Sequence, residues 1–483
     1  MIEAFGIESV YAAEEALMAT LAEGELMARA VEGLSAVTLR RLQERSARRV
    51  VGLIGTGNNG ADALYALARL ADLGFAAVAV TTGRVHEGAH DTATSAGVVF
   101  AAEADAAGSI AEADLVLDGI LGIGGRPEVP DYARGWVEAI PDAAYVIAVD
   151  LPTGADPEGR SGDPAGVFAD ETVTFSVAKP VHLLPATEPR VGLLTVVDIG
   201  LSIKQPATVC RMERDDVAAL WPVPGMGDDK YSRGVLGVVA GSADYPGAAV
   251  LVATAAAAAG AGMIRYIGPA EPRGLVHAAV PEVVPGPGRV QAWVIGPGLV
   301  STDDAGVDRL DPEQRCVVED ALAGEEPVLL DAGGLDLIAG DLGRRKGRPT
   351  VLTPHAGECA RLLGVERAAV EQDPVGHAEE LARRSGAVVL LKGSTTVIVL
   401  PDPEEPVLTQ RDAPAWLATA GAGDVLSGLI GTLLAAGLDE AVAAGLGALV
   451  HGVAADEANP GGPLRALSVA DEIPRTVARL LRR

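Results

Sequence analysis

The sequence predicts an α/β protein made of two domains, each built on a largely parallel β-sheet. Short apolar runs alternate with segments of helical period along the chain, which is typical of parallel strands covered by helices on both faces. The chain has 483 residues, enough for two hydrophobic cores, and the alternation begins again after a cluster of Pro and Gly near residue 220. We therefore expect one domain at residues 1–215 and another at residues 220–483.

The composition excludes several classes of partner. The net charge is −28, opposite in sign to a nucleic-acid groove or a polybasic membrane surface. Cys210, Cys316 and Cys359 are too few and too far apart for a disulfide scaffold or a Cys-rich metal site. The acidic N-terminus does not resemble a secretory signal, and the apolar stretch 246–264 is rich in Ala and Gly, which favours a core helix over a membrane span. We expect a cytoplasmic protein without nucleic-acid or membrane partners.

Two helices are expected before the first strand, one over Ser9–Met27 and one that ends near Glu44. Leu17, Leu21 and Met27 form an apolar stripe on the first helix. We interpret this stripe as scaffold or as a dimer contact, and we expect a homo-oligomer.

The strands come next in chain order. In the first domain, apolar runs predict strands at residues 50–55, 76–83, 115–122 and 145–154, with later strands in ETVTFSVAKP and GLLTVVDIGL. In the second domain, the expected strands lie in VLGVVAGS, MIRYIGP, AWVIGPGL, PVLLDAGG, TVLTPH and VVLLKGSTTVIVL.

A glycine-rich turn, GTGNNGAD, joins the first of these strands to a helix. The N-terminus of a helix after such a turn attracts anions, because free N–H groups and the helix dipole point at the ligand. Asn58, Asn59 and Asp62 add oxygen donors that suit an alkali or alkaline-earth ion, a ribose or an amide. The alternative is that the asparagines only adopt the backbone geometry of a tight turn.

Two further strand ends carry oxygen donors. Asp118 ends one strand and is followed by the glycine-rich loop 122–128, whereas Asp150 and Thr153 follow another strand. Ligands of open parallel sheets bind outside the carboxyl ends of the strands. Asn59, Asp118 and Thr153 could therefore share one ion, while Asp150 faces a substrate.

The motifs GTGNNGAD, DGILGIGG and AVDLPTG resemble, in order and spacing, the NAD(P)H-hydrate epimerase domain, which has a Rossmann-like three-layer fold. Ala61 and Ala63 stand where that family has glycines, and Thr153 stands where it has serine. The resemblance implies a potassium ion at Asn59, Asp118 and Thr153. It also implies substrate contacts at the following positions: Asn58, Asn59, Gly60, Ala61, Asp62, Gly122, Ile123, Gly124, Gly125, Arg126, Pro127, Glu128 and Asp150.

The second half carries a sharper pattern, TAGAGDVLSG, in which Gly421, Ala422 and Gly423 precede Asp424 and an apolar helix. Backbone amides at a helix start can stabilise a transferring phosphoryl group, and a neighbouring carboxylate can accept a proton from a substrate hydroxyl. The alternative for Asp424 is an ordinary helix N-cap.

Other segments support a nucleotide site. Lys392, Gly393, Ser394, Thr395 and Thr396 follow a buried strand and suit nucleotide phosphates, together with Gly421, Ala422 and Gly423. In TPHAGE, His355 stands at a strand end, where a core or capping role is the alternative to ligand binding. The glycines of residues 296–298 permit close approach of the backbone to a planar ligand.

These segments resemble, in order, the ribokinase-like fold and specifically the ADP/ATP-dependent NAD(P)H-hydrate dehydratase. One departure is LLDAGGL, where that family usually has a second acid at the position of Gly333. The resemblance implies Mg²⁺ with ADP or ATP, a catalytic Asp424, and substrate contacts at Ala248, Gly298, His355 and Asp424.

The two halves together imply a metabolite-repair enzyme. Reduced nicotinamide nucleotides take up water to give R and S hydrates, NADHX and NADPHX. The first domain would interconvert these epimers, with Asp150 as the acid/base candidate, and the second would dehydrate the S form at the expense of ADP or ATP. The alternatives are a vitamin or sugar kinase with an added nucleotide-binding domain, and a non-catalytic nucleotide-binding or scaffold module.

Overall fold

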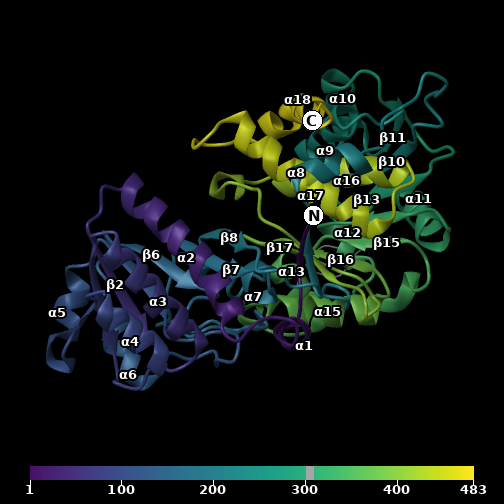
Figure 1. Ribbon diagram of the computed structural model, residues 1–483. Coiled ribbons are helices and arrows are strands. Elements are labelled where there is room, and N and C mark those ends of the chain that lie inside the picture. Colours follow the sequence, from purple (N-terminus) through teal and green to yellow (C-terminus); the bar gives the residue numbers. More distant parts are fainter. Residues whose placement is uncertain (301–308, 483) are drawn as a thin grey trace. The chain divides into compact units, whose positions relative to one another are not determined.

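The computed structural model describes residues 1–300 and 309–482 (Figure 1). Its contacts divide the chain into two compact units, one of residues Glu3–Val209 and one of Met1–Ile2 with Cys210–Arg483. Each unit contains a mainly parallel sheet with helices packed on it, which confirms the predicted α/β class. In the described part of the chain, no helix is long and apolar enough to cross a membrane.

The N-terminal unit holds a seven-stranded parallel sheet in the order β4-β3-β2-β5-β6-β7-β8. Its strands are β2 (Arg49–Ile54), β3 (Ala76–Thr81), β4 (Val99–Phe100), β5 (Leu115–Gly119), β6 (Tyr145–Val149), β7 (Glu171–Phe175) and β8 (Leu193–Val197). Its helices are α1 (Ile7–Met18), α2 (Glu25–Glu44), α3 (Asn58–Asp72), α4 (Glu87–Ser95), α5 (Ala106–Ala111), α6 (Asp131–Glu138) and α7 (Pro180–Leu183).

Two separate apolar cores show that helices cover both faces of this sheet. Residues of α2, α3 and α4 join one core, and residues of α5 and α6 join the other. The strands are buried on both faces, which explains why they are continuous apolar runs rather than alternating ones. The strand order reverses direction between β2 and β5, as in a Rossmann-like sheet, and ligands bind beside such a reversal.

The expected helix over Ser9–Met27 is wrong in its bounds. α1 ends at Met18, and Glu25–Glu44 forms the separate helix α2. Gly24 precedes α2 with a φ of 80°, a left-handed conformation that glycine adopts without a steric penalty. The apolar stripe predicted from Leu17 to Met27 therefore spans a turn between two helices.

The C-terminal unit holds an eleven-stranded sheet in the order β1-β9-β18-β17-β16-β15-β14-β13-β10-β11-β12. Its strands are β1 (Ile2–Ala4), β9 (Val209–Arg211), β10 (Val235–Val239), β11 (Met263–Ile267), β12 (Val284–Pro285), β13 (Ala292–Ile295), β14 (Val328–Leu330), β15 (Thr350–Leu352), β16 (Val388–Leu391), β17 (Thr396–Val399) and β18 (Val407–Gln410). Its helices are α8 (Arg214–Leu220), α9 (Pro246–Ala258), α10 (Ala270–Ala279), α11 (Pro312–Ala323), α12 (Gly333–Asp336), α13 (Ala356–Leu363), α14 (Arg367–Gln372), α15 (Pro374–Ser385), α16 (Ala422–Ala435), α17 (Glu440–Ala458) and α18 (Ala466–Leu480).

The strands from β10 to β16 pair in parallel, whereas β16, β17 and β18 pair antiparallel. Helices α9, α16, α17 and α18 pack on one another, and α13, α14 and α15 form a second group. The Ala- and Gly-rich sequences of α9 and α16 explain their close packing. A Cβ atom at Gly428 would stand 2.4 Å from the carbonyl oxygen of Val252, so only glycine fits there.

Candidate active sites

Three strand-end residues of the N-terminal unit come together, as the sequence predicted. The Thr153 hydroxyl donates to Asp118 Oδ1 at 2.7 Å, and the Thr153 N–H donates to Asp118 Oδ2 at 2.8 Å. The Asn59 side-chain amide donates to the carbonyl oxygens of Leu121 at 3.0 Å and Val149 at 2.5 Å. Asn59, Asp118 and Thr153 therefore form one polar cluster at the carboxyl ends of β2, β5 and β6.

Asp118 is fully buried at the end of β5. Burial raises the pKa of Asp118 to about 6, although hydrogen bonds from Thr153 and Ile120 oppose this rise. Among the described residues, no cationic side chain pairs with Asp118. A carboxylate in this position is stabilised if a cation binds beside it.

Asp150 lies next to this cluster and is held by a second network. Lys179 Nζ donates to Asp150 Oδ1 at 2.6 Å, and the Thr174 hydroxyl donates to the same oxygen at 2.8 Å. Burial alone would raise the pKa of Asp150, but the Lys179 ammonium outweighs this effect, and the pKa lies below its ordinary value. Asp150 also has a φ of 67°, a strained conformation for a non-glycine residue.

His182 fixes the backbone at Asp150. Its Nδ1 accepts a hydrogen bond from the Lys179 N–H at 3.0 Å, so the ring proton lies on Nε2, which donates to the Asp150 carbonyl oxygen at 2.8 Å. Burial, and then the Lys179 charge, lower the pKa of His182 to about 4. His182 is therefore a neutral structural donor at physiological pH.

The residues expected to contact substrate in the two glycine-rich loops, 58–62 and 122–128, differ from one another in burial and packing. A Cβ atom at Gly60 would stand 2.1 Å from Gly55 O, so close packing against the backbone requires this glycine. A Cβ atom at Gly122 would stand 2.4 Å from Asn59 Oδ1, so Gly122 leaves room for the Asn59 side chain. Ile123 packs against a small apolar cluster. Arg126 and Glu128 are exposed, and Arg126 Nε lies 3.8 Å from Glu128 Oε2. The remaining predicted contacts, Asn58, Gly124, Gly125 and Pro127, lie at the surface or partly buried on the same loops.

The two alanines that replace family glycines lie in the core. Ala61 and Ala63 are buried and belong to the apolar cluster formed by α2, α3 and α4. Their methyl groups therefore fill the interior beneath the loop rather than the space where a ligand would bind.

In the C-terminal unit, Asp424 lies in the first turn of α16. Gly421 precedes this helix with a φ of 87°, and no side chain of the described residues caps the helix start, so the N-cap alternative for Asp424 does not describe the geometry. Burial, and then the charge of Asp331, raise the pKa of Asp424 to about 7, while Lys392 opposes this rise. The pKa of Asp424 therefore lies near neutral pH.

Lys392 lies beside Asp424, and it already has an anionic partner. Its Nζ donates to Asp331 Oδ1 at 2.7 Å, and the Ser427 hydroxyl donates to Asp331 Oδ2 at 2.8 Å. Glu358 Oε2 lies 3.8 Å from the same Nζ. Lys392 therefore links β16 to the ends of β14 and α16, in addition to any role with phosphates.

The structure gives His355 a capping role. Its Nδ1 accepts hydrogen bonds from the N–H groups of Gly357 and Glu358, and Glu358 Oε2 accepts one from the His355 N–H at 2.8 Å. The imidazole is nevertheless exposed, so one of its edges faces the surface.

The remaining predicted residues of this unit, Ala248 and Gly298, lie close together because Gly298 has no side chain. A Cβ atom at Gly298 would stand 2.7 Å from the Ala248 Cβ, so these two predicted contacts are neighbours. A Cβ atom at Gly333 would stand 2.3 Å from Leu299 O. The position at which the family usually has a second acid therefore has no space for a side chain in this backbone.

Comparisons with known proteins match both halves of the chain. Residues 236–475 match the family model of the NAD(P)H-hydrate dehydratase, and residues 23–181 match that of the YjeF-related protein N-terminus. The bifunctional NAD(P)H-hydrate repair enzyme of Mycobacterium leprae is 43% identical over 99% of this chain and 97% of its own length. The chain belongs to the family of bifunctional NAD(P)H-hydrate repair enzymes.

Other members of this repair-enzyme family are similar over most of their length. The Mycobacterium tuberculosis enzyme is 45% identical, covering 91% of this chain and 90% of its own length, and the Escherichia coli K12 enzyme is 33% identical, covering 89% and 84%. Among solved structures, the Bacillus subtilis ADP/ATP-dependent NAD(P)H-hydrate dehydratase is 27% identical, covers 56% of this chain and 98% of its own, and has a TM-score of 0.48. The chain is thus an enzyme with an epimerase domain followed by a dehydratase domain.

Several residues around Asp150 in the epimerase domain carry little signal in the sequence. Lys179, Thr174 and His182 surround Asp150 but come from β7 and the start of α7, and their only sequence signal is a polar AKP after an apolar strand. Tyr11 and Glu14 of α1 lie near enough to Asp150 for their pKa values to be raised, chiefly by burial and then by nearby carboxylates. Both precede residue 23, where the family match begins.

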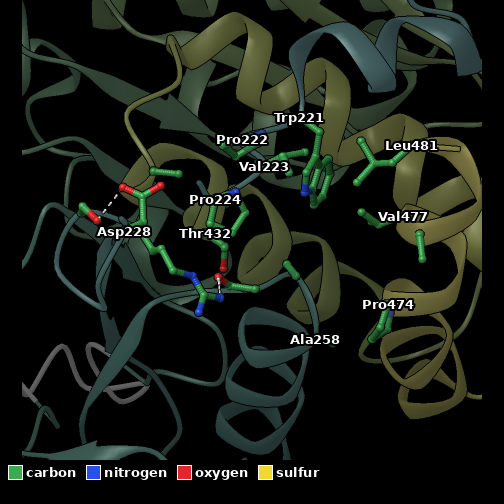
Figure 2. Close-up of a pocket in the computed structure, with 16 residues that line it drawn as sticks. Trp221, Pro222, Val223, Pro224, Asp228, Ala258, Thr432, Pro474, Val477 and Leu481 are labelled. Atoms are coloured by element: carbon green, nitrogen blue, oxygen red, sulfur yellow. Dashed lines mark hydrogen bonds between the residues drawn. The ribbon is translucent and has the colours of Figure 1, made fainter. Parts of the chain in front are cut away.

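The dehydratase domain also has a pocket that contains none of the predicted site residues. Figure 2 shows Trp221, Val477 and Leu481 around this pocket, which also adjoins the C-terminal ends of α9 and α16. Asp424 lies in the first turn of α16, at the other end of that helix. The pocket is therefore separate from the Asp424 site.

Proposed function

We propose that Asp424 of the C-terminal unit activates the substrate hydroxyl of the S hydrate for phosphorylation by ADP or ATP. Hydroxide is a poor leaving group, so phosphorylation of the hydroxyl makes elimination to the reduced nucleotide feasible. The observation that carries this proposal is the place of Asp424, in an uncapped first turn and beside Lys392, with a pKa near 7. A carboxyl group with that pKa is ionised in a large fraction of the protein molecules at neutral pH.

The nucleotide would lie across two loops. Gly421 and Gly423 offer backbone N–H groups at the start of α16, where developing negative charge is stabilised. The Ala422 N–H already donates to the Thr419 carbonyl oxygen at 3.3 Å and would have to exchange this bond for one to a phosphate. The segment 392–396 follows β16, and Gly393 and Ser394 are exposed there and free of side-chain bulk. Lys392 would stay paired with Asp331 and supply positive charge to the phosphates from one side.

The carboxylates of this site suit Mg²⁺ bound with a nucleotide. Mg²⁺ is usually held by one or two carboxylates together with substrate phosphates and water. Asp331, Glu358 and Asp424 all act on Lys392 electrostatically and are the carboxylates that could provide those oxygens. When bound, Mg²⁺ would neutralise phosphate charge during transfer.

The polar cluster of the epimerase domain suits potassium. Asp118 supplies a single buried negative charge, and Asn59 and Thr153 supply neutral oxygens, a set that matches a monovalent ion better than Mg²⁺. Bound potassium would position the substrate electrostatically. The loop of Gly122, which packs directly on Asn59, would be ordered by the same ion.

Asp150 would contact the substrate beside this cluster. Lys179 and Thr174 both bond to Oδ1, so Oδ2 is the oxygen left for a substrate in the described structure. Its lowered pKa keeps Asp150 a carboxylate, which can accept a hydrogen bond or a proton.

The proposal is tested with pure S and R hydrates of NADH and NADPH. The wild-type chain should restore the reduced nucleotide from the S form only when ADP or ATP is present. The R form should give the reduced nucleotide only after a lag, because it must first be epimerised. Accumulation of a stable phosphorylated compound, with no reduced nucleotide, would instead indicate a kinase.

A further inference from the structure

Asp62, a buried carboxyl group that the resemblance places among the substrate contacts of the epimerase domain, has no chemical role in the scheme above. Asp62 lies in the first two turns of α3, directly after the glycine-rich loop, and only 6% of it is exposed. Its Oδ1 atom is buried and has no hydrogen-bond partner among the described residues. Buried polar atoms normally have a partner, so an unpartnered oxygen at a strand-end site points to a ligand.

The surroundings of Asp62 differ from those of Asp150. Asp150 is paired with Lys179, whereas the charged groups that act on Asp62 are the carboxylates of Asp150 and Glu14. Burial, and then these two carboxylates, raise the pKa of Asp62 to about 8. Two carboxyl groups whose environments move their pKa values apart are typical of an acid and base pair.

The other ionisable groups around this end of α3 do not alter the difference between the raised pKa of Asp62 and the lowered pKa of Asp150. They come from α1, from the end of β5, from the residue before α7 and from α7 itself: Tyr11, Glu14, Asp118, Lys179 and His182. Lys179 is bonded to Asp150 and Thr174, and His182 is neutral. Neither of these groups supplies a hydrogen bond to Asp62 in the described structure.

We propose that Asp62 is the proton donor of epimerisation and gives its proton to the hydroxyl of the bound hydrate, while Asp150 stays a carboxylate held by Lys179. This inference rests on the proposed epimerase function. Asp62 thereby becomes a catalytic residue, and Lys179 a positioning residue for Asp150.

The proposed epimerisation needs no co-reactant other than water. The hydroxyl of the hydrate is on a carbon bonded to the ring nitrogen. Asp62 protonates that hydroxyl, the C–O bond breaks with its electron pair leaving on the oxygen as water, and the nitrogen lone pair forms a C=N bond. Water then adds to the opposite face of the same carbon, the C=N electrons return to nitrogen, and the surplus proton returns to Asp62.

The test uses the full-length chain with Asp62→Asn, Asp62→Glu and a matched control, Asp72→Asn, an exposed residue at the other end of α3. Epimerisation is followed after subtraction of the uncatalysed rate. Asp62→Asn should lose at least about 100-fold in kcat with little change in KM, Asp62→Glu should keep measurable activity, and Asp72→Asn should match wild type. Thermal unfolding of each variant verifies that its epimerase domain is folded, and dehydration of pure S hydrate verifies the C-terminal domain.

Two further readouts separate acid catalysis from a structural role. In ¹⁸O-labelled water, each wild-type epimerisation should place one solvent oxygen in the product hydroxyl. The infrared difference spectrum of wild type minus Asp62→Asn at neutral pH should show the band of one protonated carboxyl group. Wild-type kcat in Asp62→Asn, product without ¹⁸O, or no such band would overturn the proposal. A wild-type chain that dehydrates the S form but does not epimerise would overturn the epimerase function and the role of Asp62 with it.

Discussion

Lys392 Nζ lies 2.7 Å from Asp331 Oδ1, and this ion pair adjoins the backbone of Gly423 at the start of α16. A Cβ atom at Gly423 would stand 3.4 Å from Lys392 Nζ and 3.7 Å from Asp331 Oδ2. One lysine therefore compensates a buried carboxylate and also lowers the pKa of Asp424. The predicted phosphate ligand is at the same time the electrostatic partner of the predicted base.

Replacement of this lysine should affect stability as well as rate. Lys392→Met leaves Asp331 buried without its cation, and breaking a buried pair in this way costs about 3–5 kcal/mol of unfolding free energy. Denaturant unfolding measures this loss. Lys346→Met, at an exposed lysine, is the control and should change the free energy little. Equal stability of the two variants would show that the pair contributes nothing.

Dehydration should depend on pH through Asp424. Because the base acts as a carboxylate and burial raises its pKa to about 7, the rate should rise with pH through neutrality and then level off. Asp424→Asn keeps the shape but not the basicity, so it should lose about 100-fold or more in kcat. Epimerisation by the same variant should be unchanged. A variant with wild-type dehydration would remove Asp424 from the mechanism.

Potassium should stabilise the protein through Asp118. Its folded pKa of about 6 exceeds the ordinary value of 3.8, so burial favours the protonated form, and the associated stability is present at low pH and lost as pH rises through 6. That loss is about 3 kcal/mol when no cation is bound. KCl in place of tetramethylammonium chloride should therefore raise Tm at about pH 8 and have little effect at about pH 4.

Asp118→Asn supplies the control for the ion. An amide is neutral at every pH, so the potassium-dependent shift in Tm should disappear in this variant. A shift of the same size in Asp118→Asn would place the ion elsewhere.

The start of the C-terminal domain can be tested with two fragments of different length. β9 pairs with β18 in the C-terminal sheet, and α8 buries Val217 and packs against α18. A fragment of residues 209–483 should therefore dehydrate the S hydrate at a rate close to that of the full chain. A fragment that starts at residue 220 lacks β9 and α8 and should unfold at lower denaturant concentration. Equal stability of the two would show that these elements do not stabilise the domain.

The sequence predicts site residues best where they follow parallel strands, because the geometry of the sheet then brings them together. Asn59, Asp118 and Thr153 end neighbouring parallel strands, and such ends must meet at one edge of a sheet. Lys179 could not be found in this way, because it follows β7 and reaches Asp150 through tertiary packing. Glu14 was also missed, because its helix was interpreted as scaffold, and a stripe of apolar residues does not reveal what the other face of a helix approaches.

The two assigned steps are tested most directly by one time course on an equal mixture of R and S NADH hydrates with ADP or ATP, followed by absorbance of NADH. The wild type should restore NADH from the whole mixture. Asp424→Asn should restore NADH at least about 100-fold more slowly than the wild type, and Asp118→Asn should convert the S half rapidly and the R half at the uncatalysed rate. Rapid, complete recovery of NADH by both variants, or no recovery by the wild type, would contradict the account.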